Sequence, residues 1–217
     1  MNLLWSTVNV GIFSRDDESS YQWLSTRLST NWYVRNVDSN ILSNRSSAKF
    51  REDTRRCTFA ILYHTKTRGR INITDVTDSL YDEELEHLSS EKGKDNVILV
   101  IDDLEGDGDN GHRTRILQNQ PSIERLATEI FCFTAEEKRT LTRGGPAPEM
   151  VVKLRQIEKM IEERARRNIW RTIFRLSKVI LILWVGDQIL RGVMKKPGFW
   201  DICQKFLQKT NILSMKD

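Results

Sequence analysis

Cysteine is scarce in this 217-residue sequence, and its three cysteines lie far apart. Cys57, Cys132 and Cys203 form no CxxC pair, and the three histidines are isolated from one another. A disulfide framework or a structural zinc site needs paired or closely spaced ligands. The sequence therefore predicts neither of them, and it favours a reducing, cytosolic setting.

A basic leader and long apolar runs are missing as well. The first residues, MNLLWSTVNVGIFSRDD, have neither the positive start nor the apolar core of a signal peptide. The uninterrupted apolar run at 179–185 has seven residues, whereas a membrane-spanning helix needs about twenty. We expect neither a secretory leader nor a spanning helix.

Short apolar runs rich in branched residues alternate with charged, amphipathic segments. The stronger runs are 8–14, 57–64 and 96–104, and the weaker ones are 32–37 and 130–133. Strands that are apolar throughout need cover on both faces, which indicates a parallel sheet with right-handed crossovers. The sequence therefore predicts an α/β fold of the doubly wound, flavodoxin-like class, with a mostly parallel five-stranded sheet.

A Gly/Pro-rich segment divides the chain. Residues 140–149, TLTRGGPAPE, read as a linker between an α/β domain at 1–139 and a basic helical segment at 150–217. Residues 1–150 carry 19 Lys/Arg and 24 Asp/Glu, and residues 151–217 carry 15 and 6. Net charges of −5 and +9 give an acidic body with a basic tail, so we expect an anionic partner for the tail alone.

The carboxyl edge of the predicted sheet offers acids but no phosphate loop. Asp16, Asp17, Asp102 and Asp103 follow strands, and no GxGxxG sequence is present. Paired acids can hold Mg²⁺ as in a receiver domain, but the phospho-acceptor position of such a pocket falls on His64 or Thr65. We expect solvated loop carboxylates there, with no metal and no cofactor.

Residues 164–186, RARRNIWRTIFRLSKVILILWVG, contain no acid and form a basic amphipathic helix in helical projection. Its basic stripe holds Arg164, Arg167, Arg171, Arg175 and Lys178. Its apolar side holds Ile169, Trp170, Ile173, Phe174, Leu176, Ile180, Leu181, Leu183 and Trp184. Such a helix packs on the body, lies on an anionic membrane or docks on a partner. Nucleic acid is disfavoured, because the aromatic residues lie on the apolar side rather than as stacking platforms.

The order of elements, the SRDDES sequence after the first strand and the acidic DEEL sequence resemble a Toll/interleukin-1 receptor (TIR) domain over roughly residues 8–135. Tyr81, Asp82, Glu83, Glu84 and Leu85 are the nearest match to the WCxxEL-like element of that family, without its Trp-Cys pair. The resemblance implies an interaction and assembly module, with an innate-immune setting. In NAD-cleaving members the Glu of this element is catalytic, which makes Glu83 and Glu84 the candidate catalytic residues.

Three functions remain open from the sequence. The preferred one is a cytosolic signalling or adaptor protein, whose body binds proteins or self-associates and whose C-terminal helices dock on a membrane surface or an oligomer. The second is a TIR-like NAD glycohydrolase using Glu83 or Glu84. The third is a membrane-damaging effector whose acidic body restrains the basic helices.

Overall fold

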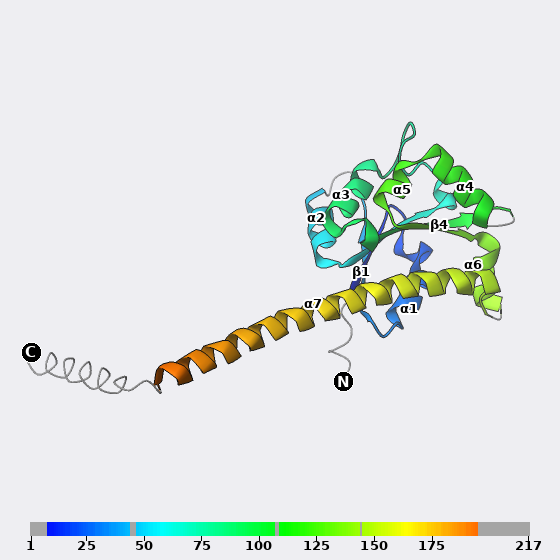
Figure 1. The fold of residues 1–217 in the computed structure, drawn as a ribbon. Coiled ribbons are helices and arrows are strands. Elements are labelled where there is room, and N and C mark those ends of the chain that lie inside the picture. Colours follow the sequence, from blue (N-terminus) through cyan, green and yellow to red (C-terminus); the bar gives the residue numbers. More distant parts are fainter. Residues whose placement is uncertain (1–7, 44–46, 107–108, 144, 195–217) are drawn as a thin grey trace, which may run out of the picture. The chain divides into compact units, whose positions relative to one another are not determined.

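A five-stranded, entirely parallel sheet forms the centre of the computed structural model, which describes residues 8–43, 47–106, 109–143 and 145–194. The strands have the spatial order β2-β1-β3-β4-β5 (Figure 1). They are β1 (Val8–Ser14), β2 (Val34–Ile41), β3 (Phe59–Thr65), β4 (Val97–Leu104) and β5 (Glu129–Thr134). This order reverses at β1, so the predicted doubly wound, flavodoxin-like α/β fold is confirmed.

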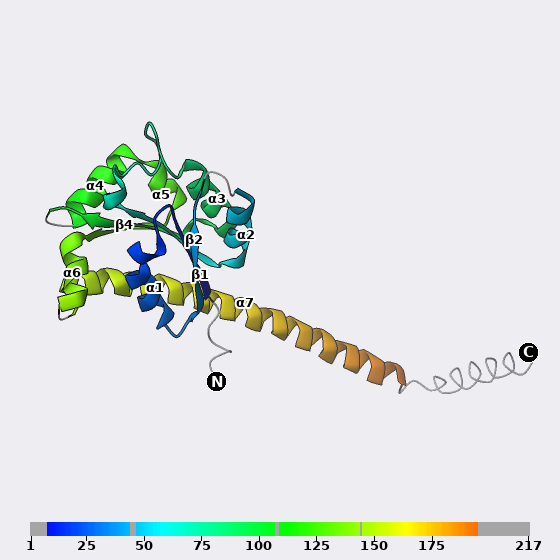
Figure 2. The ribbon, with the colours of Figure 1, turned by 180° about the vertical axis from the view of Figure 1, so that it is seen from behind.

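Helices cover both faces of the sheet (Figures 1 and 2). One hydrophobic cluster joins the sheet to α1 (Gln22–Ser29) and to the first part of α7 (Pro148–Met194). The other cluster joins it to α3 (Asp82–Lys92), α4 (Asp109–Asn119) and α5 (Ser122–Leu126), with α2 (Ser47–Arg56) at its margin. The remaining helices are α6 (Ala135–Arg143) and the short 3-10 turns η1 (Glu18–Ser20), η2 (Lys66–Arg68) and η3 (Lys94–Asn96).

Burial explains the strands. Every residue of β3 is buried, as two covered faces require, and β1 has the bounds expected from its apolar run. The edge strand β2 instead runs through Asp38, Ser39 and Asn40, beyond the predicted end at 37. An edge strand tolerates polar residues because one of its sides faces water.

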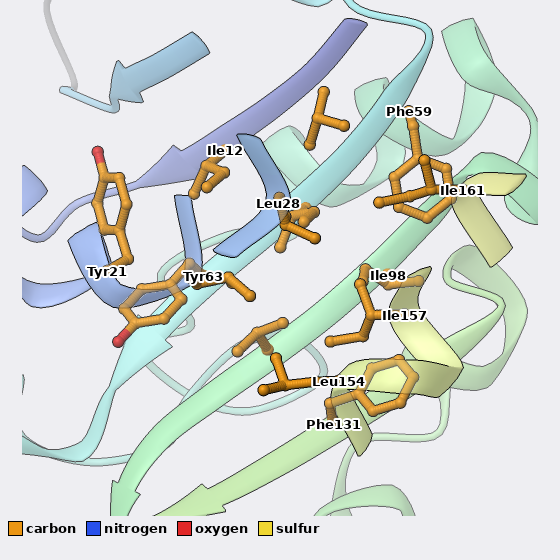
Figure 3. Close-up of a cluster of buried hydrophobic side chains, with 14 of the residues drawn as sticks. Ile12, Tyr21, Leu28, Phe59, Tyr63, Ile98, Phe131, Leu154, Ile157 and Ile161 are labelled. Atoms are coloured by element: carbon orange, nitrogen blue, oxygen red, sulfur yellow. The ribbon is translucent and has the colours of Figure 1, made fainter. Parts of the chain in front are cut away.

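The first part of α7 belongs to the core of the α/β body. Met150, Leu154, Ile157, Ile161 and Ala165 are almost completely buried in the first cluster. Leu154, Ile157 and Ile161 point into this cluster from α7 (Figure 3). Their steps of three and four residues place one stripe of the helix on the sheet.

The boundary of the body therefore lies later in the chain than the linker suggested. The first compact unit is Met1–Ile169 and the second is Trp170–Asp217. Residues 140–143 lie in α6, because Pro146 and Gly145 interrupt the helix only after them. Residues 105–112, EGDGDNGH, have the composition of a flexible loop, but α4 begins within them at Asp109 because its later residues pack in the core. The amphipathic pattern of residues 199–213 predicts a last short helix, which lies outside the described residues.

Candidate functional site

A buried polar cluster centred on Asp102 occupies the carboxyl edge of the sheet. Asp102 lies near the end of β4 and is fully buried. Its Oδ2 atom accepts hydrogen bonds from Trp23 Nε1 at 3.2 Å, from Lys138 Nζ at 2.8 Å and from the Tyr63 hydroxyl. Its Oδ1 atom accepts from the Asp103 amide at 2.6 Å. This carboxylate therefore ties α1, β3 and α6 to the end of β4.

Asp103 extends the cluster through an unusual backbone conformation. Its φ of 57° lies in the left-handed region, at the point where the β4–β5 register shifts. The carboxylate accepts from Thr65 Oγ1 at 2.7 Å and from Lys138 Nζ at 3.0 Å. Burial alone lowers the pKa of Lys138, but the hydrogen bonds and charges of Asp102 and Asp103 outweigh it and raise that pKa. Lys138 is thus held as a cation that contacts both acids.

Asp16 forms a second group at the end of β1, joined to the first through Thr65. It accepts from the Thr65 amide at 3.1 Å and lies 3.4 Å from an Arg68 guanidinium nitrogen. Its own amide donates to Ser14 Oγ at 3.0 Å. The expectation of solvated carboxylates is wrong for Asp16 and Asp102, which are buried and hydrogen-bonded. In the part of the chain that the structure describes, no three His, Cys, Asp or Glu side chains gather to hold a metal ion.

The candidate catalytic residues Glu83 and Glu84 line a pocket of about 500 Å³. Its walls come from α2 (Ser47, Phe50, Arg51), from α3 (Asp82, Glu83, Glu84, His87), and from Arg15, Leu42, Ser43, Ser79 and Leu80. Parallel strands end at this edge of the sheet, which is where α/β proteins place ligand sites. The structure thus brings both residues to a cavity that could hold a small molecule.

The two glutamates have different surroundings. Glu84 is half-buried and pairs with Arg15 at 2.6 Å. Arg15 also donates from Nε to the Leu80 carbonyl at 2.9 Å and lies over the Tyr81 ring at 5.5 Å. Glu83 is exposed at the pocket rim. Glu84 is therefore fixed by its cation, and Glu83 is the carboxylate that solvent or a ligand reaches.

Cys57 and His64 do not form a nucleophilic pair. The Cys57 thiol donates to the Thr54 carbonyl at 3.3 Å, and burial raises its pKa to about 11. His64 is fully buried at the end of β3, with Nδ1 at 3.4 Å from the Tyr81 hydroxyl. A thiol with this pKa stays protonated at neutral pH, so Cys57 acts as a small core residue.

The second unit begins inside α7 and exposes large apolar side chains. Of the predicted docking residues, Trp170, Ile173, Phe174, Leu176, Ile180, Leu181, Leu183 and Trp184 are all exposed. Val179, Ile182 and Val185 are exposed too. The cations Arg171, Arg175 and Lys178 are exposed in the same segment. We call residues 170–185 the docking segment.

The predicted basic stripe is divided between the two units. Arg164 is half-buried in the first unit, and Arg167 donates to Asn96 Oδ1 at 3.5 Å there. Ile169, the last residue of that unit, is half-buried. The docking segment therefore retains Arg171, Arg175 and Lys178 from the stripe. No described helix has both the length and the apolar character to cross a membrane.

Two comparisons with known proteins add no relationship: no model of a protein family matches the chain, and no curated protein sequence matches it. The acids of the Asp102 cluster are hydrogen-bonded within the protein and share the cation of Lys138, whereas the pocket at Glu83 and the docking segment present accessible groups. The docking segment presents exposed apolar side chains with exposed cations beside them.

Proposed function

We propose that this chain is a non-enzymatic signalling or adaptor protein that docks on an anionic membrane surface through its docking segment. The observation that carries the proposal is the exposure of the apolar side chains from Trp170 to Val185. Contiguous apolar surface of this kind marks an interaction site, because water solvates it unfavourably. The signalling setting rests on the resemblance to TIR domains.

The docking segment follows an interruption in the stripe that packs in the core. Continuing the core series by steps of three and four from Ala165 reaches the polar Asn168 and Thr172, and only then the apolar Leu176, Val179 and Leu183. Ile169, Ile173 and Ile180 form a second apolar row beside this series. The apolar side of the docking segment is therefore wider than the stripe that covers the sheet.

Charge favours an anionic lipid surface over a second copy of the helix. Arg171, Arg175 and Lys178 are exposed beside the apolar residues, and residues 164–186 contain no Asp or Glu. Two such helices have no acids with which to form interhelical ion pairs. Phosphatidylserine headgroups supply that negative charge, worth about 1 kcal/mol for each cation near the surface.

Vesicle binding by the full chain tests the proposal. The full chain is expected to sediment with phosphatidylcholine–phosphatidylserine vesicles at low salt, and much less with phosphatidylcholine alone. Reversing the charges of Arg171, Arg175 and Lys178 to Glu should weaken partitioning about a hundredfold, since about 1 kcal/mol is lost at each site.

The matched control reverses three cations of the body, Lys49, Arg55 and Lys94, which are exposed and lie outside the docking segment. This control should bind nearly as the unmodified chain does. Equal loss in both variants, or no binding at low salt, overturns the proposal. Release of a trapped dye on binding would identify the membrane-damaging alternative, in which bound chain also disrupts the bilayer.

The pocket supports one second candidate, a TIR-like NAD glycohydrolase in which Glu83 is the catalytic residue. The supporting observation is that Glu83 is exposed at the rim of a cavity of about 500 Å³. Nicotinamide release from NAD by purified chain, abolished by Glu83→Gln, would establish this candidate. Release that is absent at high protein concentration would eliminate it.

A further inference from the structure

The basic stripe of the docking segment changes character along the helix. From Arg171, steps of four and three reach Arg175 and Lys178, and the next two steps reach Ile182 and Val185. Ile182 is 69% exposed, the highest value among the large apolar residues that the structure describes. The face that is cationic up to Lys178 is therefore apolar beyond it.

Residues 179–185 are consequently apolar on every side of the helix. All seven, VILILWV, are exposed. A helix lying flat in the interface keeps one polar face in water, but this part has no polar face to keep there. A helix with apolar side chains on every side is normally buried in a protein core or in lipid.

A lipid leaflet meets this requirement. An α-helix satisfies its backbone hydrogen bonds internally, so it can enter hydrocarbon. Seven residues rise about 10 Å, which is about a third of the ~30 Å hydrocarbon thickness. The apolar part therefore fits within one leaflet when the helix lies at a low angle to the surface, so that the cations before it and Asp187 after it both reach the lipid headgroups.

We propose that residues 179–185 insert into the hydrocarbon of one leaflet of an anionic bilayer, while Arg171, Arg175 and Lys178 stay at the headgroups. This inference rests on the proposed membrane docking and specifies its geometry. A second copy of the helix is a poorer occupant, because one packed neighbour covers one face and leaves the opposite face in water.

A lysine at position 182 separates insertion from flat binding. On a flat helix, Ile182→Lys extends the cationic stripe in water and should strengthen partitioning to phosphatidylserine-containing vesicles about fivefold. On an inserted helix the same lysine enters hydrocarbon and should weaken partitioning about tenfold or more. The matched control Ile182→Leu keeps the apolar face and should bind like the unmodified chain.

The outcomes distinguish the two proposals. Binding of the unmodified chain that Ile182→Lys weakens supports insertion, provided that Ile182→Leu leaves it unchanged. Binding that Ile182→Lys strengthens or leaves unchanged overturns insertion and keeps membrane docking. No binding of the unmodified chain overturns both. Unchanged thermal unfolding of the body excludes misfolding as the cause, since position 182 lies in the second unit.

A fluorescent label gives a second readout that does not depend on affinity. In a Cys203→Ser background, Ile182→Cys carries an environment-sensitive nitrobenzoxadiazole label, while Cys57 and Cys132 are buried and inaccessible. Insertion predicts a blue-shifted emission that spin-labelled acyl chains quench when vesicles are added. Emission that stays as in water, with the chain bound, contradicts insertion.

Discussion

Asp102 and Lys138 explain why the acids at the end of β4 are not exposed to solvent as an open acidic site. A buried carboxylate is costly unless donors and a cation compensate it. Here Trp23, Tyr63 and Lys138 supply donors, and Lys138 also reaches Asp103. The carboxylate oxygens that a receiver-like pocket would offer to Mg²⁺ thus accept hydrogen bonds from other residues of the protein. The cluster holds α1, β3 and α6 against the end of β4.

His64 makes stability depend on pH. It is fully buried beside Tyr81, and desolvation lowers its pKa below the ordinary 6.5; Asp16 opposes this shift, and Arg68 and Lys66 add to it. The folded state therefore binds fewer protons than the unfolded state. The stability contributed by neutral His64 is present above about pH 6.5 and is lost as the pH falls below it. For one proton the slope is at most about 1.4 kcal/mol per pH unit.

Urea unfolding of the unmodified chain and of His64→Gln, followed by circular dichroism at pH 7.5, 6.5 and 5.5, measures this contribution. The variant should be less stable at pH 7.5, and the gap between the two proteins should narrow at pH 5.5. A gap that is the same at all three pH values contradicts the assigned role of His64.

At the scale of elements, α7 combines a part that packs in the core with the exposed docking segment. Its first part places Ile157 in the cluster with no exposed surface, while Val152 on the same part is 55% exposed. Ile157→Ala should lower the free energy of unfolding by about 2–5 kcal/mol, because it removes buried methyl groups and leaves a cavity. Val152→Ala, the matched control, should change it by about 0.5 kcal/mol or less. Equal effects in urea unfolding would show that α7 does not pack on the sheet in solution.

The sequence predicted those elements whose own residues carry the signal. Val10, Ile12 and Phe13 in β1, like Ile61 and Leu62 in β3, are branched or aromatic and buried, so the two strands stood out. The start of α4 was missed because its glycine and aspartates favour a loop locally, while packing of Ile116 in the second cluster holds the helix. The secondary structure of that segment is therefore set by burial in the core and not by the local helix propensity of its residues.

The site was predictable only where function depends on a continuous stretch of chain. The docking residues follow helical steps, and Glu83 and Glu84 came from a family resemblance. Lys138 carried no sequence signal, because its partners Asp102 and Asp103 lie 36 and 35 residues earlier. The Arg15–Glu84 pair joins residues 69 positions apart. Such contacts arise from the way the strands end together, which spacing alone does not encode.

At the scale of the whole molecule, the division at Ile169 predicts which shortened chains fold. The buried core of the described residues ends at Ala165, and the first compact unit closes at Ile169. A chain of residues 1–169 keeps the core stripe of α7, so it should unfold cooperatively with a melting temperature close to that of the full chain. It should not bind anionic vesicles, because it lacks the docking segment.

A chain of residues 1–147 tests the alternative boundary near the Gly/Pro segment. It loses the α7 side chains that cover the first cluster, and with them Lys153, whose Nζ lies 2.8 Å from Glu137 Oε1 and 2.6 Å from the Cys132 carbonyl oxygen. Both charges of that pair are buried, so removing the lysine leaves the Glu137 carboxylate without its cation. The apolar side chains on this face of the sheet also become exposed to water. Circular dichroism should therefore show no cooperative thermal transition for 1–147. If this chain melts cooperatively like 1–169, then the first part of α7 is an accessory to the α/β body and not part of its core.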